Sequence, residues 1–193
     1  PAGVQEVMDY GLFGFALSRF AGVWAGLKCI KDTIEVTSVV NGDPLRLDFV
    51  TPEFDMPEGG LNIRLIDTPQ AQEARVIDHK RRAVQAFARA NRMDKRVLGQ
   101  AGAKIGFVAA GKNWLDLAHA MQVLGIDQGA AVRHGVTTYK VAITWPLDML
   151  SFAEWAEGLD CIVVVEEKRK LIEGQIKEAL FNQKCSCRVF GSK

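Results

Sequence analysis

Short apolar segments alternate with amphipathic ones from residue 103 onward, and this alternation constrains the fold more than any other feature. The segments predicted as strands are 103–110, 137–143, 161–165 and 186–190, and those predicted as helices are 114–124, 147–157 and 171–181. Strands that alternate with helices predict a mainly parallel sheet flanked by helices, so we expect an α/β domain here. The uninterrupted apolar run at 161–165 is typical of a strand that is buried on both faces.

The first half of the sequence is organised differently. Residues 4–30 show the helical spacing of apolar side chains, with Gly11 and Gly22 as candidate breaks. Apolar side chains cover most sides of this helix, so other elements must enclose it. The residues after it supply only two short segments predicted to be extended, 33–40 and 45–50. We therefore expect the first 50 residues to be the end of a domain whose remainder lies outside this chain.

An extended arm and a basic helix are expected between the two halves. Residues 51–72 carry three prolines and two glycines without periodicity, which predicts an arm that packs along a surface. Residues 71–93 are rich in alanine and form a predicted helix. From 71 to 96 the charge is +5, but the sequence lacks a groove-reading motif, so a solvated face or a subunit contact is favoured over nucleic-acid binding. The predicted division of the chain is 1–50, 51–102 and 103–193.

The bulk composition is that of an ordinary soluble globular protein, with 48% hydrophobic and 24% charged residues and a net charge of +1. The apolar stretch 12–27 is interrupted by Ser18 and Arg19 and is shorter than the about twenty residues that a membrane span needs. No signal peptide is recognisable, and the first residue is Pro1. These features predict an internal piece of a cytoplasmic protein with no membrane partner.

Metal-ligating patterns are weak in this sequence. Cys29 and Cys161 lie in apolar surroundings and are expected to be buried thiols. Cys185 and Cys187 form a Cys-x-Cys without a second pair, so no complete zinc or iron–sulfur site is predicted for this chain alone. The histidines, which lack metal-ligand spacing, are His79, His119 and His134.

The end of the first predicted strand is the best candidate for chemistry. Residues 106–113 differ from a phosphate-binding P-loop by one position, because Asn113 stands where a Ser or Thr would hold Mg²⁺. The residues between Gly106 and Gly111 also belong to the predicted strand and not to a loop. What remains is Lys112 at a strand's carboxyl end before a helix, where anions can bind, against the alternative of a plain turn.

Two further strand ends carry candidate residues. Trp145 and Pro146 come after the second predicted strand, and Trp145 is either a core side chain or part of a pocket or interface. Residues 166–170 come after the third strand and have the sequence EEKRK. Glu166 and Glu167 would point to opposite faces, so ion pairing or a domain contact is favoured over an acid/base pair. Glu167 is expected in the first turn of the next helix, where it would favour the helix dipole.

Several strings taken together resemble the fused indolepyruvate ferredoxin oxidoreductases, a branch of the 2-oxoacid:ferredoxin oxidoreductases. Those that resemble the end of the pyrimidine-binding domain or the segment after it are QEVMDYGLFG at 5–14, ALSRF at 16–20, DTIE at 32–35, GGLNIR at 59–64 and AFARANR at 86–92. Those that resemble the transketolase C-terminal-like domain of that family are AGKN at 110–113, YKV at 139–141, WPL at 145–147 and VVEEKR at 164–169. The resemblance covers nearly the whole chain.

This resemblance implies a parent enzyme that decarboxylates aryl pyruvates oxidatively. Thiamine diphosphate with magnesium would attack the keto carbon, coenzyme A would take the acyl group, and 4Fe-4S clusters would pass electrons to ferredoxin. The catalytic groups would lie outside this chain, which is therefore expected to bind none of these cofactors alone and to be inert alone. Its expected partners are the other domains of the same polypeptide within a homodimer.

The same resemblance suggests approximate places for the candidate residues. Lys112 and Trp145 would be nearest the substrate or coenzyme A entrance, whereas Asp32 and Glu35 would lie nearer the cofactor. Asn113 departs from the hydroxyl residue of the family's turn, which weakens an anion role for Lys112. The residues expected at a domain interface are Glu166, Glu167, Lys168 and Arg169.

Two alternatives stay open from the sequence. One is the C-terminal-type domain of another thiamine enzyme, such as a transketolase or a 2-oxoacid dehydrogenase component. The long helix and the arm at 51–72 argue against it. The other is a non-enzymatic regulatory module that binds anions at Lys112.

Overall fold

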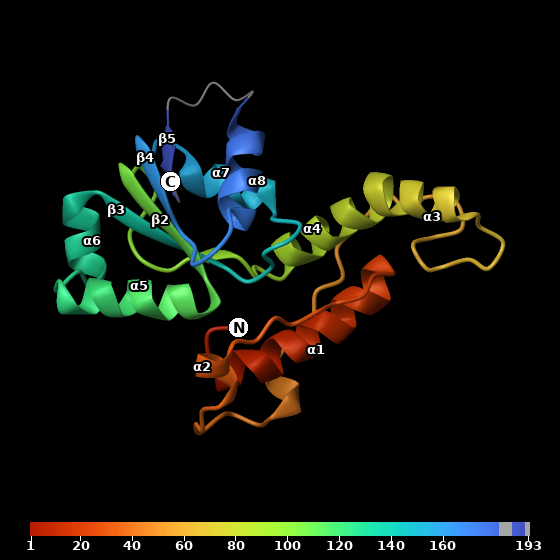
Figure 1. Ribbon diagram of the computed structural model, residues 1–193, viewed down its shortest axis with the longest axis horizontal. Coiled ribbons are helices and arrows are strands. Elements are labelled where there is room, and N and C mark those ends of the chain that lie inside the picture. The colour runs from red at the N-terminus through yellow and green to blue at the C-terminus, as the bar shows by residue number, and fades with distance from the viewer. Residues whose placement is uncertain (182–186, 192–193) are drawn as a thin grey trace. The chain divides into compact units, whose positions relative to one another are not determined.

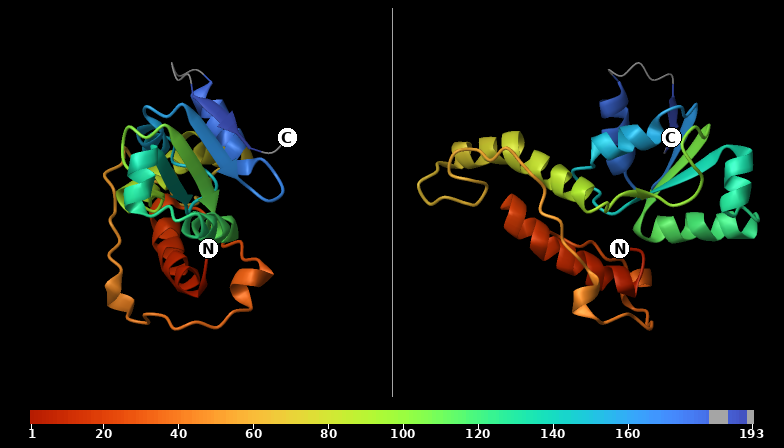
Figure 2. Two further views of the ribbon diagram at one scale, coloured as in Figure 1. Left: turned by 90° about the vertical axis from the view of Figure 1, so that its left-hand side faces the viewer. Right: turned by 180° about the vertical axis from the view of Figure 1, so that it is seen from behind.

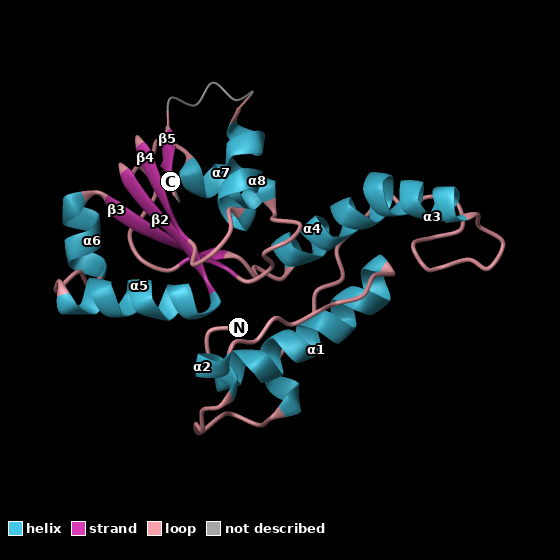
Figure 3. Cartoon of the chain, in the orientation of Figure 1, coloured by secondary structure: helices cyan, strands magenta, loops and turns pink. Residues whose placement is uncertain are grey.

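The structure is a computed structural model that describes residues 1–181 and 187–191. The chain divides into two compact units, Gly3–Arg92 and Met93–Lys193. Within residues 3–92, all of which are described, the regular elements are helical, whereas the second unit is built on a five-stranded sheet (Figure 1, Figure 3). Among the described residues, no helix has the length and apolar character that crossing a membrane requires.

The first unit begins with α1 (Val4–Ala21), which stops at a glycine. Gly22 takes a left-handed φ of 64°, and its amide donates to the carbonyl of Ser18. A Cβ at Gly22 would lie 2.2 Å from the carbonyl oxygen of Leu61, so only glycine fits there. The helix predicted over 4–30 therefore ends well before its expected boundary, at the second candidate break.

The remaining helices of the first unit are short apart from α4. They are α2 (Lys31–Ile34), the 3-10 turn η1 (Pro44–Arg46), α3 (Pro69–Arg75), the π-helical turn η2 (Val76–Lys80) and α4 (Arg81–Ala90). The extended segments predicted at 33–40 and 45–50 are wrong at their starts, because residues 33–34 belong to α2 and residues 45–46 to η1, and the rest of each segment forms no strand. Their β-favouring residues have no neighbouring strand to pair with, and strand propensity depends on that context.

One aromatic contact joins the arm to α1, but the arm residues Ile63, Leu65 and Ile66 are exposed, so the predicted packing along a surface is confirmed only in part. Phe54 of the arm and Phe20 of α1 have ring centroids 6.2 Å apart, and Phe20 also lies 5.9 Å from Phe87 of α4. The buried Lys80 donates from Nζ to the carbonyl of Gly22 over 2.7 Å. One cation of the basic segment is therefore buried within the first unit. Phe15 on α1, by contrast, is 68% exposed.

The sheet of the second unit has the order β1-β3-β2-β4-β5. Its strands are β1 (Lys95–Arg96), β2 (Ile105–Ala110), β3 (Val136–Val141), β4 (Cys161–Val165) and β5 (Arg188–Phe190). All neighbours are parallel except β1, which pairs antiparallel with β3. The mainly parallel α/β fold predicted from the sequence is confirmed. The two-residue β1 was not predicted, and Ser186, expected in the last strand, lies outside the described residues.

Helices cover both faces of this sheet (Figure 2). They are α5 (Gly111–Val123), α6 (Gln128–His134), α7 (Met149–Ala156) and α8 (Leu171–Leu180). The larger core lies under α7 and α8 and includes Val108, Tyr139, Phe152, Trp155 and Ile162. A smaller cluster under α5 includes Ala109, Trp114, Leu117 and Met121. The unpredicted α6 begins at the capping side chain of Asp127 and ends at Gly135, which has a φ of 65°.

Gly106 explains how closely α7 approaches the sheet. A Cβ at this position would lie 2.5 Å from the Trp155 ring and 2.7 Å from Leu159. The glycine of β2 therefore serves the packing of α7, and residues 107–110 belong to a strand as predicted, not to a phosphate-binding loop. The cysteine prediction was wrong, because Cys29 and Cys161 are only partly buried; they are free, as is Cys187, while Cys185 lies outside the described residues.

Candidate functional site

Three neighbouring parallel strands end at the same edge of the sheet in the second unit. Ala110 of β2 lies opposite Val141 of β3, and Ala109 lies opposite Val165 of β4. The segments that come after these strands, 111–113, 142–145 and 166–169, are called the carboxyl edge below. It brings together the predicted residues Lys112, Asn113, Trp145, Glu166, Glu167, Lys168 and Arg169. The other two predicted site residues, Asp32 in α2 and Glu35 at its end, belong to the first unit.

The connections at this edge diverge between β2 and β4. The chain leaves β2 through α5 toward β3 on one side, whereas it leaves β4 through α8 toward β5 on the other. In open α/β sheets such a divergence creates a crevice at the carboxyl ends of the strands, and ligands bind there. Residues 111–113 and 166–169 flank this position.

Lys112 is engaged within its own helix. Its Nζ lies 2.8 Å and 2.7 Å from the two carboxylate oxygens of Asp116, one turn along α5. This i,i+4 pair neutralises much of the charge that would attract an anion. Helix α5 starts at Gly111 with a φ of 55°, and Ala110 supplies no capping side chain. The arrangement favours the plain strand-to-helix turn over a lysine-based anion site.

Glu166 caps helix α8. Its Oε1 accepts from the amide of Ile172 over 2.9 Å, and its Oε2 accepts from the amide of Glu173 over 3.0 Å. Two amides of the helix N-terminus thereby have a charged partner from the preceding strand end. Glu167 was expected in the first turn of this helix, which was wrong because α8 begins only at Leu171. Glu167 instead lies 3.9 Å from Lys168 in an exposed ion pair.

Trp145 is not a core residue, since its side chain is 56% exposed. It precedes Pro146 across a cis peptide bond. Gln175 of α8 holds the chain on both sides of it: its Nε2 donates to the carbonyl of Thr144, and its Oε1 accepts from the amide of Leu147, each over 2.9 Å. An exposed indole is thus carried on a backbone segment that is fixed from α8.

Sequence reasoning missed Asp94, an acid just before β1 that contacts segment 142–145 of the carboxyl edge. It is 7% exposed, and its Oδ1 accepts from the amides of Ala142 over 2.7 Å and Ile143 over 3.1 Å. Burial raises the pKa of Asp94 to about 6, against backbone amides that lower it, and the nearby Asp148 raises it further. The pKa of Tyr139 rises well above its usual value because of burial and the nearby charges of Asp94 and Asp148.

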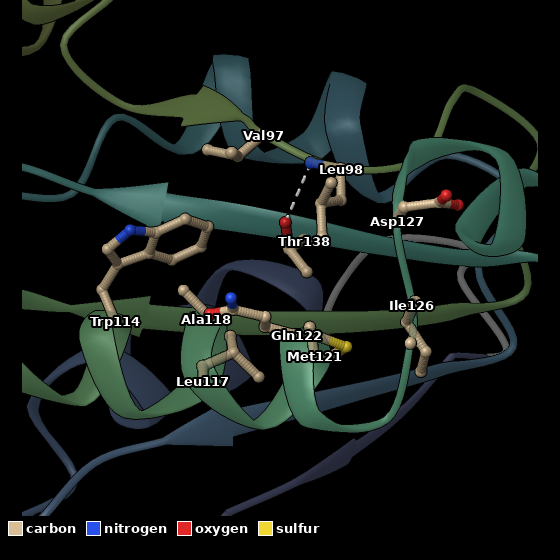
Figure 4. A pocket seen from close by; sticks show the side chains of 11 residues that line it. Val97, Leu98, Trp114, Leu117, Ala118, Met121, Gln122, Ile126, Asp127 and Thr138 are labelled. Atoms are coloured by element: carbon tan, nitrogen blue, oxygen red, sulfur yellow. Dashed lines mark hydrogen bonds between the residues drawn. The ribbon is translucent and has the colours of Figure 1, made fainter.

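An apolar pocket of about 440 Å³ lies on the α5 side of the sheet (Figure 4). It is lined by Val97, Leu98, Trp114, Leu117, Ala118, Met121, Gln122, Gly125, Ile126, Asp127 and Thr138. Two of its polar groups are engaged: Thr138 Oγ1 accepts from the amide of Leu98 over 3.0 Å, and the Asp127 side chain caps α6. None of the residues predicted from the sequence to form a site lines this pocket.

Metal-ligating side chains do not gather in the described part of the chain, where no three His, Cys, Asp or Glu residues form a group that could hold an ion. The carboxylates of the buried Asp94 and the partly buried Glu166 accept hydrogen bonds from backbone amides. The three described cysteines, Cys29, Cys161 and Cys187, are free, whereas a 4Fe-4S cluster needs four thiolates.

A family model described as the indolepyruvate oxidoreductase domain matches residues 95–193, slightly more than half of the chain. The chain belongs to this family. The match begins at β1 and covers the whole sheet and every residue of the carboxyl edge. A comparison with curated proteins gives no match.

Two solved structures are distantly similar to this chain. A 2-oxoglutarate:ferredoxin oxidoreductase from Magnetococcus marinus, with 2-oxoglutarate, coenzyme A and succinyl-CoA bound, is 14% identical over 78% of this chain and 25% of its own, with a TM-score of 0.43. A split-gene transketolase, an inactive β4 tetramer, is 19% identical over 50% of this chain and 31% of its own, with a TM-score of 0.36. The chain thus spans less than a third of either protein, and its family membership rests on the sequence model.

Proposed function

We propose that this chain is part of a thiamine-diphosphate-dependent 2-oxoacid:ferredoxin oxidoreductase that converts aryl pyruvates such as indolepyruvate to acyl-CoA. The observation that carries the proposal is the family match over residues 95–193. Thiamine diphosphate, bound elsewhere in the parent enzyme with magnesium, would supply the carbanion chemistry of decarboxylation. Coenzyme A and ferredoxin would be partners of that enzyme, through 4Fe-4S clusters held by its other domains in a cytoplasmic homodimer.

The role of this chain within the enzyme is architectural. At the carboxyl edge, Lys112 is paired with Asp116, and Glu166 caps α8, so these charges stabilise the domain and are not poised for proton transfer. Trp145 is 56% exposed, and we assign it, together with Lys112, to the border of the substrate or coenzyme A entrance, with Asn113 next to Lys112 in the chain. Residues 166–169 contact a neighbouring domain in this proposal.

The first unit is assigned by the same proposal. In this proposal residues 1–50 are the end of the pyrimidine-binding domain, 51–102 form the arm and linker helix, and 103–193 form the transketolase C-terminal-like domain. The last residues of the linker, from Met93 on, belong to the second unit and include β1. Asp32 and Glu35 lie toward the cofactor. The exposed apolar side chains of α1, such as Phe15 at 68%, suit a helix that is completed by the rest of its domain.

Substrate competition in the parent enzyme tests this function. Indolepyruvate, phenylpyruvate, pyruvate and 2-oxoglutarate are compared by kcat/KM with coenzyme A and an artificial electron acceptor. We expect the aryl substrates to be preferred and the 193-residue chain alone to show no turnover with thiamine diphosphate and magnesium. Preference for an aliphatic 2-oxoacid would refute the substrate assignment, and turnover by the chain alone would refute its architectural role.

The alternative of an anion-binding module predicts a different result. Calorimetry of the 193-residue chain with coenzyme A and with nucleotides would then show tight nucleotide binding. The ion pair of Lys112 with Asp116 weighs against that outcome, because the lysine would have to exchange an intramolecular carboxylate for the ligand.

A further inference from the structure

We propose that Asp94 is a positioning residue that clamps segment 142–145 at the carboxyl edge in its carboxylate form and loosens this segment when it takes a proton. The clamp is inferred from contacts within the second unit. Its consequence for substrate access rests on the proposed function, in which Trp145 borders the entrance.

The backbone places Asp94 at the point where β3 runs out of a partner strand. Strand β1 pairs with β3 through two residues only, Lys95 with Lys140 and Arg96 with Tyr139. Beyond Val141 the next two amides, those of Ala142 and Ile143, donate to Asp94 Oδ1 and not to a strand. Asp94 Oδ1 therefore takes the place of a partner strand for these two amides and fixes the direction in which the chain leaves the sheet.

The other end of the segment is held independently. Gln175 bonds to the carbonyl of Thr144 and to the amide of Leu147, so it fixes the chain on either side of Trp145. Gln175 does not ionise, which makes this anchor independent of pH. Asp94 is therefore the one of these two anchors whose strength depends on a proton.

The two oxygens of Asp94 have different roles. Oδ1 accepts the amide hydrogen bonds of Ala142 and Ile143, whereas Oδ2 is buried and accepts none of similar geometry among the described residues. The backbone amide of Asp148 also lies near the carboxyl and, like the other two amides, lowers the pKa of Asp94. A proton therefore goes to Oδ2, and Oδ1 becomes a neutral carbonyl oxygen. Hydrogen bonds to an ionised acceptor are about twice as strong as those between neutral groups, so protonation weakens both contacts at once.

The groups around Asp94 set its pKa close to neutral pH. Asp148, just before α7, raises the pKa of Asp94, and Glu154 of α7 acts on the pKa of Tyr139 in the same direction. Tyr139 of β3 stays a neutral phenol, and Arg96 of β1 lies opposite it in the sheet. Burial is the largest cause, and it places the pKa of Asp94 at about 6.

Amide chemical shifts measure the clamp directly. In the 193-residue chain, the amide protons of Ala142 and Ile143 are followed by NMR from about pH 5 to 8, on either side of the Asp94 pKa. We expect both to titrate with one midpoint near 6, moving downfield as Asp94 ionises, while the core amide of Val164 stays constant. In Asp94→Asn, which keeps an acceptor oxygen but no charge, neither amide should titrate. Absence of titration in the wild-type chain, or the same titration in the variant, would overturn the clamp.

Asp148→Asn is a second probe that keeps the clamp. Removing the Asp148 charge should move the midpoint of both amides to lower pH without abolishing the transition. An unchanged or higher midpoint would contradict the electrostatic account, and this readout does not require the Asp94 variant to fold.

The functional consequence is measured separately in the parent enzyme. The KM for the 2-oxoacid should change through the same pH midpoint in the wild type, but not in Asp94→Asn, whose KM at about pH 8 should match that of the wild type at about pH 5.5, where Asp94 is mostly protonated. If the amides titrate while KM stays flat, the clamp holds and the entrance role of Trp145 fails. If the amides do not titrate, the clamp itself fails, whatever the enzyme does.

Discussion

Asp94→Asn should alter how the stability of the second unit depends on pH. A pKa of about 6 in the folded chain, against an ordinary value of 3.8, means that the folded state binds the proton more tightly than the unfolded state does. The free energy of unfolding contributed by this group is then fully present below pH 3.8 and is lost as pH rises through 6. The difference between the two pKa values corresponds to about 3 kcal/mol of unfolding free energy. About 1.4 kcal/mol of this is lost as the pH rises from about 5 to 8.

The asparagine variant has no proton to exchange at this position, so its unfolding free energy lacks this dependence on pH. Between about pH 5 and 8 its unfolding free energy, relative to that of the wild type, should rise by about 1.4 kcal/mol. Because the chain has two units, unfolding by urea is best followed at a fluorine-labelled Trp155, which packs in the core beside Tyr139. The change with pH is the quantity of interest, since the substitution also adds a pH-independent offset.

A matched control is Asp160→Asn, which removes an exposed acid of the same unit. Its pH profile should stay parallel to that of the wild-type chain. Parallel profiles for Asp94→Asn and the wild type would refute the reasoning, as would a wild-type chain whose stability rises more steeply than the variant's as the pH is raised.

Three further substitutions test packing and anchoring in the second unit. Gly106→Ala should lower the unfolding free energy by about 1–3 kcal/mol, because the added Cβ meets the Trp155 ring. Its control, Gly174→Ala, adds a Cβ in open space on α8 and should leave the unfolding free energy unchanged or raise it by up to about 1 kcal/mol. Equal effects of the two substitutions in urea unfolding would contradict the close approach of α7 to the sheet. Gln175→Leu should cost about 1–3 kcal/mol and raise the amide exchange rate of Leu147, and unchanged exchange would contradict its anchoring role. Lys112→Ala should change stability by less than about 1 kcal/mol, since its ion pair is exposed, and a larger loss in thermal unfolding would point to a deeper role.

The elements that could be predicted from the sequence are those with a strong apolar signal. Strand β4 was predicted with the bounds that it has in the structure because all five of its residues are apolar, as burial on both faces requires. Strand β1 gave no such signal, since it consists of Lys95 and Arg96. Helix α6 is only seven residues long, and the sequence carried its two boundary signals, Asp127 and Gly135, without a long periodic stretch between them.

The sequence predicts which of the candidate residues come together at one edge of the sheet, but not what each of them contacts there. Strand ends drew attention to Lys112, Trp145 and Glu166, and the parallel register brings all three to the carboxyl edge. What each side chain does there depends on partners that the spacing of residues does not reveal. Glu166 caps a helix that starts five residues later, at Leu171, and Asp94 gains its role from a strand pairing with residues more than forty positions away.

In the proposed function, the carboxyl edge carries charged residues near a ligand entrance while catalysis belongs to other domains of the parent enzyme. Its lysine is held by Asp116, its first glutamate by α8, and its buried aspartate by the amides after β3. Each of these charges is stabilised by a partner fixed in the same unit, so moving one toward a substrate would leave that partner unsatisfied at a cost of about 1–3 kcal/mol. Asp94 has a pKa near neutral pH, and it acts on the backbone that carries the exposed Trp145. The chemistry that this edge can contribute is therefore the placement of that side chain, which the proton on Asp94 adjusts.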